Sequence, residues 1–206
     1  MNKIIFLFIF SLAFYCRAQS LNEIIESYNN SIDPNGKLDS IAEIQFDITH
    51  KAFNLENGLF LDETLTNTYS IYGDNYSINW KDGIKRDMNI FTISEWQREN
   101  IIKNHFNLLI REDDEVFELI ESNDSIYIVK MFSDDREVYH EIDRLTYNLK
   151  KRITRSKGKE MTLAFSEYKI IEGVNTPTVM KFYSELGNAE ITNSNYRFTK
   201  ISKEKD

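Results

Sequence analysis

The chain contains one cysteine, two prolines and seven glycines among its 206 residues. The cysteine, Cys16, lies in an apolar N-terminal stretch, so the rest of the chain can form no disulfide and no thiolate metal site. Beyond that stretch, no apolar run approaches the ~20 residues of a membrane-spanning helix. With 41% hydrophobic and 28% charged residues, the composition is that of a globular protein and excludes collagen and general disorder.

The sequence also lacks the common motifs of enzymes. It has no G-x-S-x-G nucleophile elbow, no G-x-G-x-x-G dinucleotide loop and no phosphate-binding P-loop. The histidines, His50, His105 and His140, have no second His or Cys at metal-ligand spacing. The one local cluster, His140 and Glu141 with Asp143, supplies at most two converging ligands, and we expect ordinary surface or turn residues there. The acidic runs at 112–115 and 134–135 are typical of turns. We therefore expect a non-catalytic protein without cofactor or metal.

Residues 1–18 have the pattern of a secretory signal peptide, with a basic Lys3, an apolar core and a cleavage site after Ala18. Lipoprotein signals have a small residue directly before the cysteine, whereas Tyr15 precedes Cys16 here. We therefore expect Cys16 to be removed with the signal rather than lipidated.

The expected mature domain, residues 19–206, is strongly acidic. The whole chain has 25 basic and 33 acidic residues, a net charge of −8, and loss of the two basic residues of the signal brings the balance to 23 against 33, or −10. Such a surface disfavours nucleic acid and anionic membrane surfaces. We expect a periplasmic or secreted single-domain monomer with no membrane span.

Two segments have helical patterning. Residues 20–32 predict an amphipathic helix, which opens on a capping box formed by Ser20 and Glu23 and ends at the turn sequence of residues 33–36. A second capping box and apolar residues at helical spacing predict an inserted helix over residues 94–110.

Most of the remaining chain alternates apolar and polar residues with period two, as strands do. The glycines fall in predicted turns, of which Asn57-Gly58 is the strongest hairpin signal. We predict an α+β domain with a long, curled antiparallel meander. Its concave face must be filled by side chains, covered by helices or occupied by a ligand. The predicted strands begin at residue 42 and continue over 59–72, 76–81, 84–92, 115–121, 125–132, 137–142, 146–155, 160–170, 174–185 and 189–201.

Large apolar residues repeat on single faces of these strands and along the inserted helix. They are candidates for lining a ligand cavity, although the same pattern is typical of plain core packing. The candidate ligand-binding residues are Phe46, Tyr76, Ile78, Trp80, Trp96, Ile102, Phe106, Met161, Leu163 and Phe165.

Several short pieces of sequence carry a family resemblance. These are the capped helix with Leu21, Ile24, Ile25 and Tyr28, the Pro34-Asn35-Gly36 break, the turn sequence Ile142-Asp143-Arg144-Leu145-Thr146-Tyr147, and Tyr168, Gly173 and Pro177 in a Y-x-x-x-x-G-x-x-x-P pattern. Together with the predicted layout they resemble the periplasmic outer-membrane lipoprotein carriers, the LolA and LolB-like superfamily, in the versions common in Bacteroidota. The resemblance implies a half-open barrel closed by helices, with acyl chains held in its cavity.

Three functions remain open at this stage. The first is a periplasmic binding or carrier protein that holds a lipid, an acyl chain or a lipoprotein anchor in its curled sheet. The second is an envelope protein-interaction or sensor domain of the same fold, with a cavity filled by its own side chains and no ligand. The third and least favoured is a hydrolase with a dispersed site, since triads are recognised by geometry rather than sequence.

Overall fold

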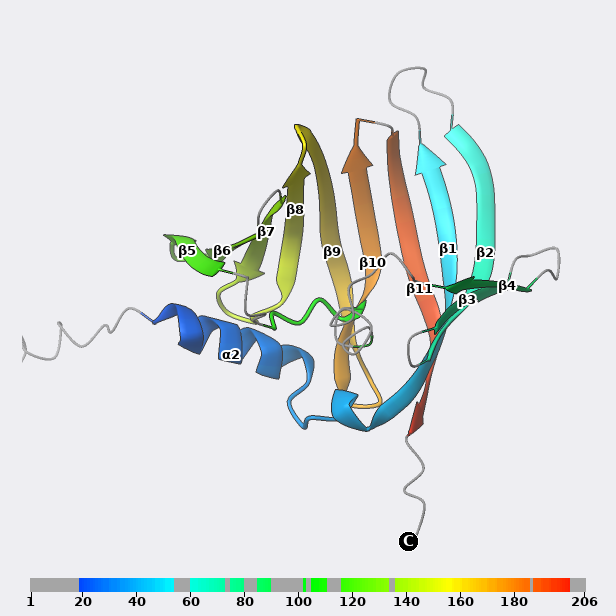
Figure 1. Ribbon diagram of the computed structural model, residues 1–206, viewed down its shortest axis with the longest axis horizontal. Coiled ribbons are helices and arrows are strands. Elements are labelled where there is room, and N and C mark those ends of the chain that lie inside the picture. Colours follow the sequence, from blue (N-terminus) through cyan, green and yellow to red (C-terminus); the bar gives the residue numbers. More distant parts are fainter. Residues whose placement is uncertain are drawn as a thin grey trace, which may run out of the picture.

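The computed structural model describes residues 19–53, 60–72, 75–79, 85–89, 102, 105–110, 116–133, 136–185 and 187–200. These residues form one antiparallel sheet of eleven strands, which curls around a single α-helix, α2 (Leu21–Ile32) (Figure 1). The predicted half-open barrel with an N-terminal helix is therefore confirmed. The remaining elements are η1 (Leu38–Ser40), β1 (Ile41–Phe53), β2 (Phe60–Tyr72), β3 (Asn75–Asn79), β4 (Lys85–Asn89), β5 (Val116–Ser122), β6 (Ile126–Ser133), β7 (Arg136–Asp143), β8 (Leu149–Ser156), β9 (Lys159–Ile171), β10 (Val174–Ser184) and β11 (Gly187–Lys200).

The sheet consists of two meanders joined edge to edge. Its strand order is β4-β3-β2-β1-β11-β10-β9-β8-β7-β6-β5, so the first strand pairs with the last. In that pairing Ile44 of β1 lies opposite Phe198 of β11. Hairpin signals predict the two meanders, but nothing local in the sequence indicates the β1–β11 pairing that unites them.

Helix α2 forms as its capping box predicts. The Ser20 hydroxyl accepts from the backbone N–H of Glu23 at 3.3 Å, while the Glu23 carboxylate accepts from the Ser20 N–H at 2.7 Å. The helix ends at Asp33, whose carboxylate accepts the backbone N–H groups of Lys37 and Leu38 and so opens the 3-10 turn η1. Within the described residues, no helix is long and apolar enough to cross a membrane.

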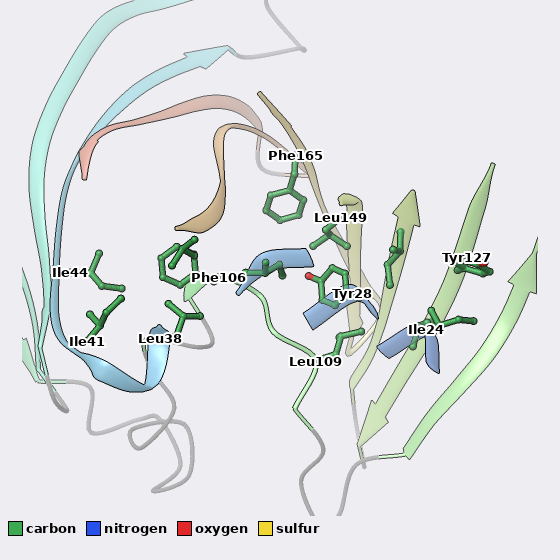
Figure 2. Packing of buried hydrophobic residues seen from close by; sticks show 14 of the residues in the cluster. Ile24, Tyr28, Leu38, Ile41, Ile44, Phe106, Leu109, Tyr127, Leu149 and Phe165 are labelled. Carbon is green, nitrogen blue, oxygen red and sulfur yellow. The ribbon is translucent and has the colours of Figure 1, made fainter. Parts of the chain in front are cut away.

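The core lies between α2 and the concave face of the sheet. Ile24 and Tyr28 of the helix are completely buried, and so is Ile44 of β1. Phe106 and Leu109 belong to the same buried cluster as these residues (Figure 2). The concave face is thus covered partly by a helix and partly by the chain around residue 106.

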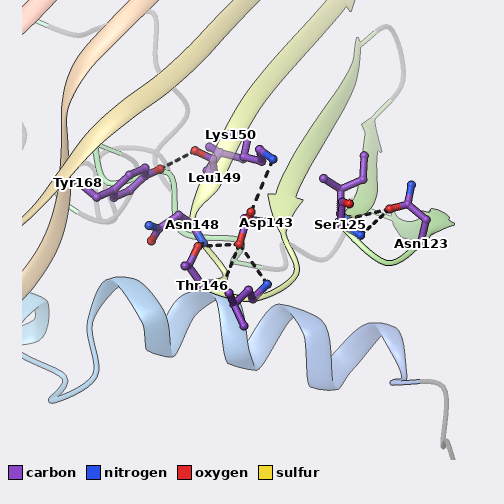
Figure 3. A network of polar contacts seen from close by, with 10 residues as sticks. Asn123, Ser125, Asp143, Thr146, Asn148, Leu149, Lys150 and Tyr168 are labelled. Carbon is purple, nitrogen blue, oxygen red and sulfur yellow. Dashed lines mark hydrogen bonds and ion pairs between the residues drawn. The ribbon is translucent and has the colours of Figure 1, made fainter.

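The turn between β7 and β8 anchors the start of α2 (Figure 3). The Asp143 carboxylate accepts from the backbone N–H groups of Leu145 and Thr146, and from the Thr146 hydroxyl at 2.9 Å. Tyr147 has a left-handed φ of 56° and donates its hydroxyl to the Gln19 side chain. Because of this turn, β8 begins only at Leu149, and the predicted start of that strand at residue 146 is wrong.

The predicted inserted helix ends earlier than its periodicity indicates. Ile102 and His105 have helical conformation, but the chain turns at Phe106 and Asn107, and residues 108–110 are not helical. Asn107 adopts a left-handed φ of 59°, a conformation that ends helices and that asparagine tolerates better than most residues. The first part of the prediction, residues 94–101, lies outside the described residues.

Candidate functional site

Residues 105–110, here called the crossing segment, pass between α2 and the sheet. Asn29 of α2 clamps the segment, because its side chain donates to the carbonyl of Leu109 and accepts from the N–H of the same residue, both at 2.9 Å. The Tyr28 hydroxyl donates to the carbonyl of Asn107 at 2.8 Å. On the sheet side, Arg152 donates from Nη1 to the Asn107 side-chain oxygen. The segment is therefore held from both sides.

A cavity of about 260 Å³ remains between the crossing segment and the concave face. Its walls come from the segment on one side and from four neighbouring strands, β8 to β11, on the other. Both apolar and polar side chains line it: His105, Phe106, Asn107, Arg152, Leu163, Phe165, Thr176, Pro177, Met180, Ile191, Asn193 and Tyr196.

Strand register explains why residues so distant in sequence share this wall. Arg152 of β8 lies directly opposite Leu163 of β9, and directly opposed residues point to the same face. Two residues further along β9, Phe165 lies opposite Met180 of β10, which in turn lies opposite Ile191 of β11. The pleat alternates side chains with period two, so the register places these residues on one face. The wall therefore runs from a basic side chain at β8 to apolar ones at β9 to β11.

The cavity lies where β10 and β11 part. Their register covers Val179–Ser184 of β10, starting at the pair of Val179 and Thr192. Before Val179, β10 remains paired only with β9, through Pro177 opposite Tyr168. In β9, next to that pair, Glu167 has a left-handed φ of 51° and accepts the Thr178 hydroxyl at its carbonyl. Proline is tolerated where a strand lacks a neighbour on one side, and Pro177 lies before the point at which β10 pairs with β11. Pro177 of the Y-x-x-x-x-G-x-x-x-P pattern therefore lies where β10 and β11 separate, and Tyr168 of the same pattern lies opposite it in β9.

An aromatic cluster bounds the cavity on the β1 and β11 side. Phe46 stacks on Tyr196 with ring centroids 5.1 Å apart, and its ring lies 4.6 Å from that of His105. The His105 ring meets Phe106 edge to face at 5.0 Å. Burial lowers the pKa of His105 to about 4, so this imidazole is neutral at neutral pH and acts as part of an apolar wall.

Buried polar atoms without partners occur along the concave face. Among the described residues, Nε of Arg152, Oδ1 of Asn193 and Nδ1 of His140 are enclosed and form no hydrogen bond. Arg152 and Asn193 line the cavity itself. Burial lowers the pKa of Arg152, with a further lowering by Arg136, while the nearby Tyr28 acts in the opposite direction. Unpaired buried polar atoms are costly, and in native proteins they often mark a place for a ligand or water.

The structure brings together part of the predicted ligand-binding set. Phe106, Leu163 and Phe165 line the cavity. Phe46 does not line it, but stacks on Tyr196, which does. Of the others, Ile102 is partly buried against the core cluster, and Met161 is partly buried two residues before Leu163 on the same face of β9. Only the backbone of Tyr76 and Ile78 is described, in β3 on the far side of β1, and Trp80 and Trp96 lie outside the described residues.

Sequence reasoning missed several residues of this wall. Arg152 lies in the strand sequence LKKRITRS, where neighbouring lysines indicate a solvated strand rather than a buried cation. Met180, Ile191 and Asn193 occur in strands that were predicted correctly, but their common face depends on register that local patterning does not give. His140 contradicts the expectation of a surface or turn residue. It is 4% exposed, because β7 turns it toward the covered concave face beside Arg152.

Comparison with known proteins supports the fold. No protein-family model matches the chain, and a search of curated proteins also finds no match. Solved structures do resemble it. A LolA superfamily protein from Nitrosomonas europaea is 12% identical with a TM-score of 0.53, over 89% of this chain and 96% of that one. A DUF1329 family protein from Desulfovibrio piger has 12% identity and a TM-score of 0.54, over 88% and 94%.

A third similar structure is a putative outer membrane lipoprotein-sorting protein domain from Vibrio parahaemolyticus, with 12% identity, a TM-score of 0.51 and coverage of 89% of this chain and 93% of that one. At such low identity the likeness concerns the fold alone. The chain therefore has a LolA-like fold, in agreement with the resemblance seen in its sequence. The closer assignment to the Bacteroidota versions stays a prediction.

Proposed function

We propose that this protein is a non-catalytic binding or carrier protein of the bacterial cell envelope that holds an apolar ligand in the cavity of its curled sheet. The observation that carries the proposal is the cavity of about 260 Å³ between the crossing segment and strands β8 to β11. The ligand would be a lipid, an acyl chain or the lipid anchor of a lipoprotein. The envelope location rests on the signal-like residues 1–18, which lie outside the described residues, and on the fold shared with a lipoprotein-sorting domain.

The lining suits such a ligand chemically. Leu163, Phe165, Met180 and Ile191 supply a continuous apolar wall, and binding pockets for small molecules are mostly apolar with a few placed polar groups. The volume corresponds to roughly nine groups of the size of a water molecule, at ~30 Å³ each. A short acyl chain, or part of a longer one, fits this space.

A specific observation favours the second candidate, an interaction or sensor domain without a ligand. The aromatic rings of Phe46, His105, Phe106 and Tyr196 fill the concave side over β1 and β11 with side chains of the protein itself. If side chains filled the rest of the concave face in the same way, no cavity would remain and apolar probes would not bind. The two candidates therefore differ in one measurable property.

Binding of a neutral apolar fluorescent probe, such as N-phenylnaphthylamine, tests the proposal. Leu163→Trp adds a bulky ring to the cavity wall, whereas Leu145→Trp makes the same change at a turn residue that is 90% exposed. The larger tryptophan ring takes up space that about two methylene-sized groups of the probe would occupy. At ~0.8 kcal/mol for each group, Leu163→Trp should bind the probe about tenfold more weakly. The Leu145→Trp control should bind as the unaltered protein does. Failure of the unaltered protein to bind any apolar probe would favour the ligand-free candidate.

A further inference from the structure

We infer that the cavity recognises an amphipathic ligand with an acidic head group, and that Arg152 pairs with that group while the tail lies along β9 to β11. The inference rests on the proposed function, since it names the chemical class of the ligand that the same cavity takes. It starts from one residue, the Arg152 guanidinium, which lines the cavity.

Arg152 has too few partners for a cation in this position. Its Nη1 donates to the side-chain oxygen of Asn107, a neutral acceptor, and its Nε is enclosed without any hydrogen bond. No carboxylate among the described residues forms an ion pair with it, although neighbouring cations do have such partners, for example Lys130 with Glu137 and Arg155 with Glu160. A guanidinium has five N–H donors and stays charged, so burial without a counter-charge is costly. An anion from outside the protein would remove that cost.

One edge of the guanidinium forms no hydrogen bond with the described residues, and its Nε is enclosed in this conformation. With Nη1 bound to Asn107, the Nε and Nη2 groups remain, and together they form a flat edge that pairs with two oxygens of a carboxylate or phosphate. Because the Arg152 side chain lines the cavity, a rotation about its side-chain torsions turns this edge toward the ligand.

The direction of the tail follows from the sheet order. Arg152 lies in β8 at one end of the cavity, and Asn193 lies in β11 at the other, three strand spacings away or ~14 Å. Leu163, Phe165, Met180 and Ile191 occupy the strands between these ends and on the β11 side. A single-chain amphiphile with its acid at β8 would therefore lay its tail across apolar side chains. The unpaired Oδ1 of Asn193 would remain for a water molecule or for a hydroxyl on the ligand.

The test is calorimetric titration of the unaltered mature protein with four ligands of equal chain length and different head groups: octanoate, octyl phosphate, octanol and octylammonium. A charge-assisted pair with Arg152 should make octanoate, octyl phosphate or both bind about ten- to a hundredfold more tightly than octanol, and octylammonium should bind weakest. A preference for octanoate would indicate a fatty acid as the natural ligand, and a preference for octyl phosphate a phosphate-bearing lipid.

Variants assign the preference to the residue. Arg152→Gln should bring octanoate down to the affinity of octanol and leave octanol unchanged, while Arg152→Lys should keep part of the preference. Arg155→Gln is the matched control, because Arg155 lies in the same strand on the opposite face, exposed and paired with Glu160. Should Arg152→Gln fail to fold, the head-group series on the unaltered protein and on Arg152→Lys still decides.

Two results would separate this inference from the proposed function. Equal affinity for octanoate and octanol, or an acid preference that survives in Arg152→Gln, would overturn the role of Arg152 and leave an apolar-ligand carrier intact. No binding of any of the four ligands would overturn both.

Discussion

Two buried imidazoles, those of His140 and His105, make the stability of the protein sensitive to acid. Burial lowers the pKa of His140 to about 3, helped by the charges of Arg152 and Arg136, and lowers that of His105 to about 4. An unfolded histidine has a pKa near 6.5, so the unfolded state takes up these protons first as the pH falls. The stabilisation is complete above pH 6.5 and is lost progressively toward pH 4.

The expected result is a free energy of unfolding that falls by up to about 1.4 kcal/mol per pH unit for each histidine below pH 6.5. Carboxylates with lowered pKa, such as Glu137 with its ordinary value of 4.5, add their own loss only near and below that value. Urea denaturation at several pH values between about 5.5 and 6.5 therefore reports mainly on the histidines. In His140→Leu the slope should be about half that of the unaltered protein. An identical slope in both proteins would mean that His140 is accessible to protons in the folded state.

The burial of an individual residue was predictable from sequence only where the local apolar and polar pattern agreed with the residue's surroundings in the fold. Phe46 alternates with polar neighbours, and Phe165 repeats at period two with Leu163; both phenylalanines are buried as such patterns predict. Arg152 and His140 are polar residues on the covered face of β7 and β8, and the sequence gives no sign that α2 and the crossing segment will cover them. Their burial is decided by tertiary contacts, in particular by the Asn107 side chain that reaches Arg152.

At the scale of elements, the contact between α2 and the crossing segment determines whether the concave face stays covered. Asn29 makes two hydrogen bonds with the backbone of Leu109, which is 4% exposed. Asn29→Ala removes both and leaves a buried N–H and a buried carbonyl without partners. We expect the free energy of unfolding to fall by about 2–4 kcal/mol, given the ~1–3 kcal/mol cost of each unsatisfied group.

Thermal or urea unfolding of Asn29→Ala measures this loss. Asn30→Ala is the matched control, because Asn30 is the next residue of the same helix and is exposed to solvent. The variant should also show faster backbone hydrogen exchange at Leu109. A loss no larger than that of Asn30→Ala would show that the crossing segment does not depend on the clamp.

The elements themselves followed closely from local sequence. The capping box of Ser20 and Glu23 sets the start of α2, and glycines with positive φ, such as Gly158 and Gly173, occupy the β8–β9 and β9–β10 turns. The errors arose at two residues that adopt local conformations outside regular helix and strand, Asp143 and Asn107. The Asp143 carboxylate holds the chain in a turn before β8, and the left-handed Asn107 ends the inserted helix early. Both residues favour such local conformations for the same physical reason, a short polar side chain that competes with regular hydrogen bonding.

At the scale of the whole molecule, the fold was predictable and the cavity was not. Hairpin turns and period-two strands indicate a curled meander, but the closure of β1 on β11 joins segments about 150 residues apart. β10 and β11 pair only from Val179 onward, and the cavity lies under the crossing segment where the two strands are not paired, beside Pro177. Position and volume of the cavity are therefore properties of the assembled sheet.

The most direct test of the carrier proposal is to identify what the protein holds when it is isolated from the envelope of its own cells. Purified protein is extracted with organic solvent, and the extract is analysed by mass spectrometry beside extracts of Leu163→Trp and of the exposed control Leu145→Trp. We predict one class of lipid or acyl compound in near-stoichiometric amount in the unaltered protein and the control, and its depletion in Leu163→Trp. Extracts without any such compound, or with equal amounts in all three proteins, would contradict a ligand in this cavity.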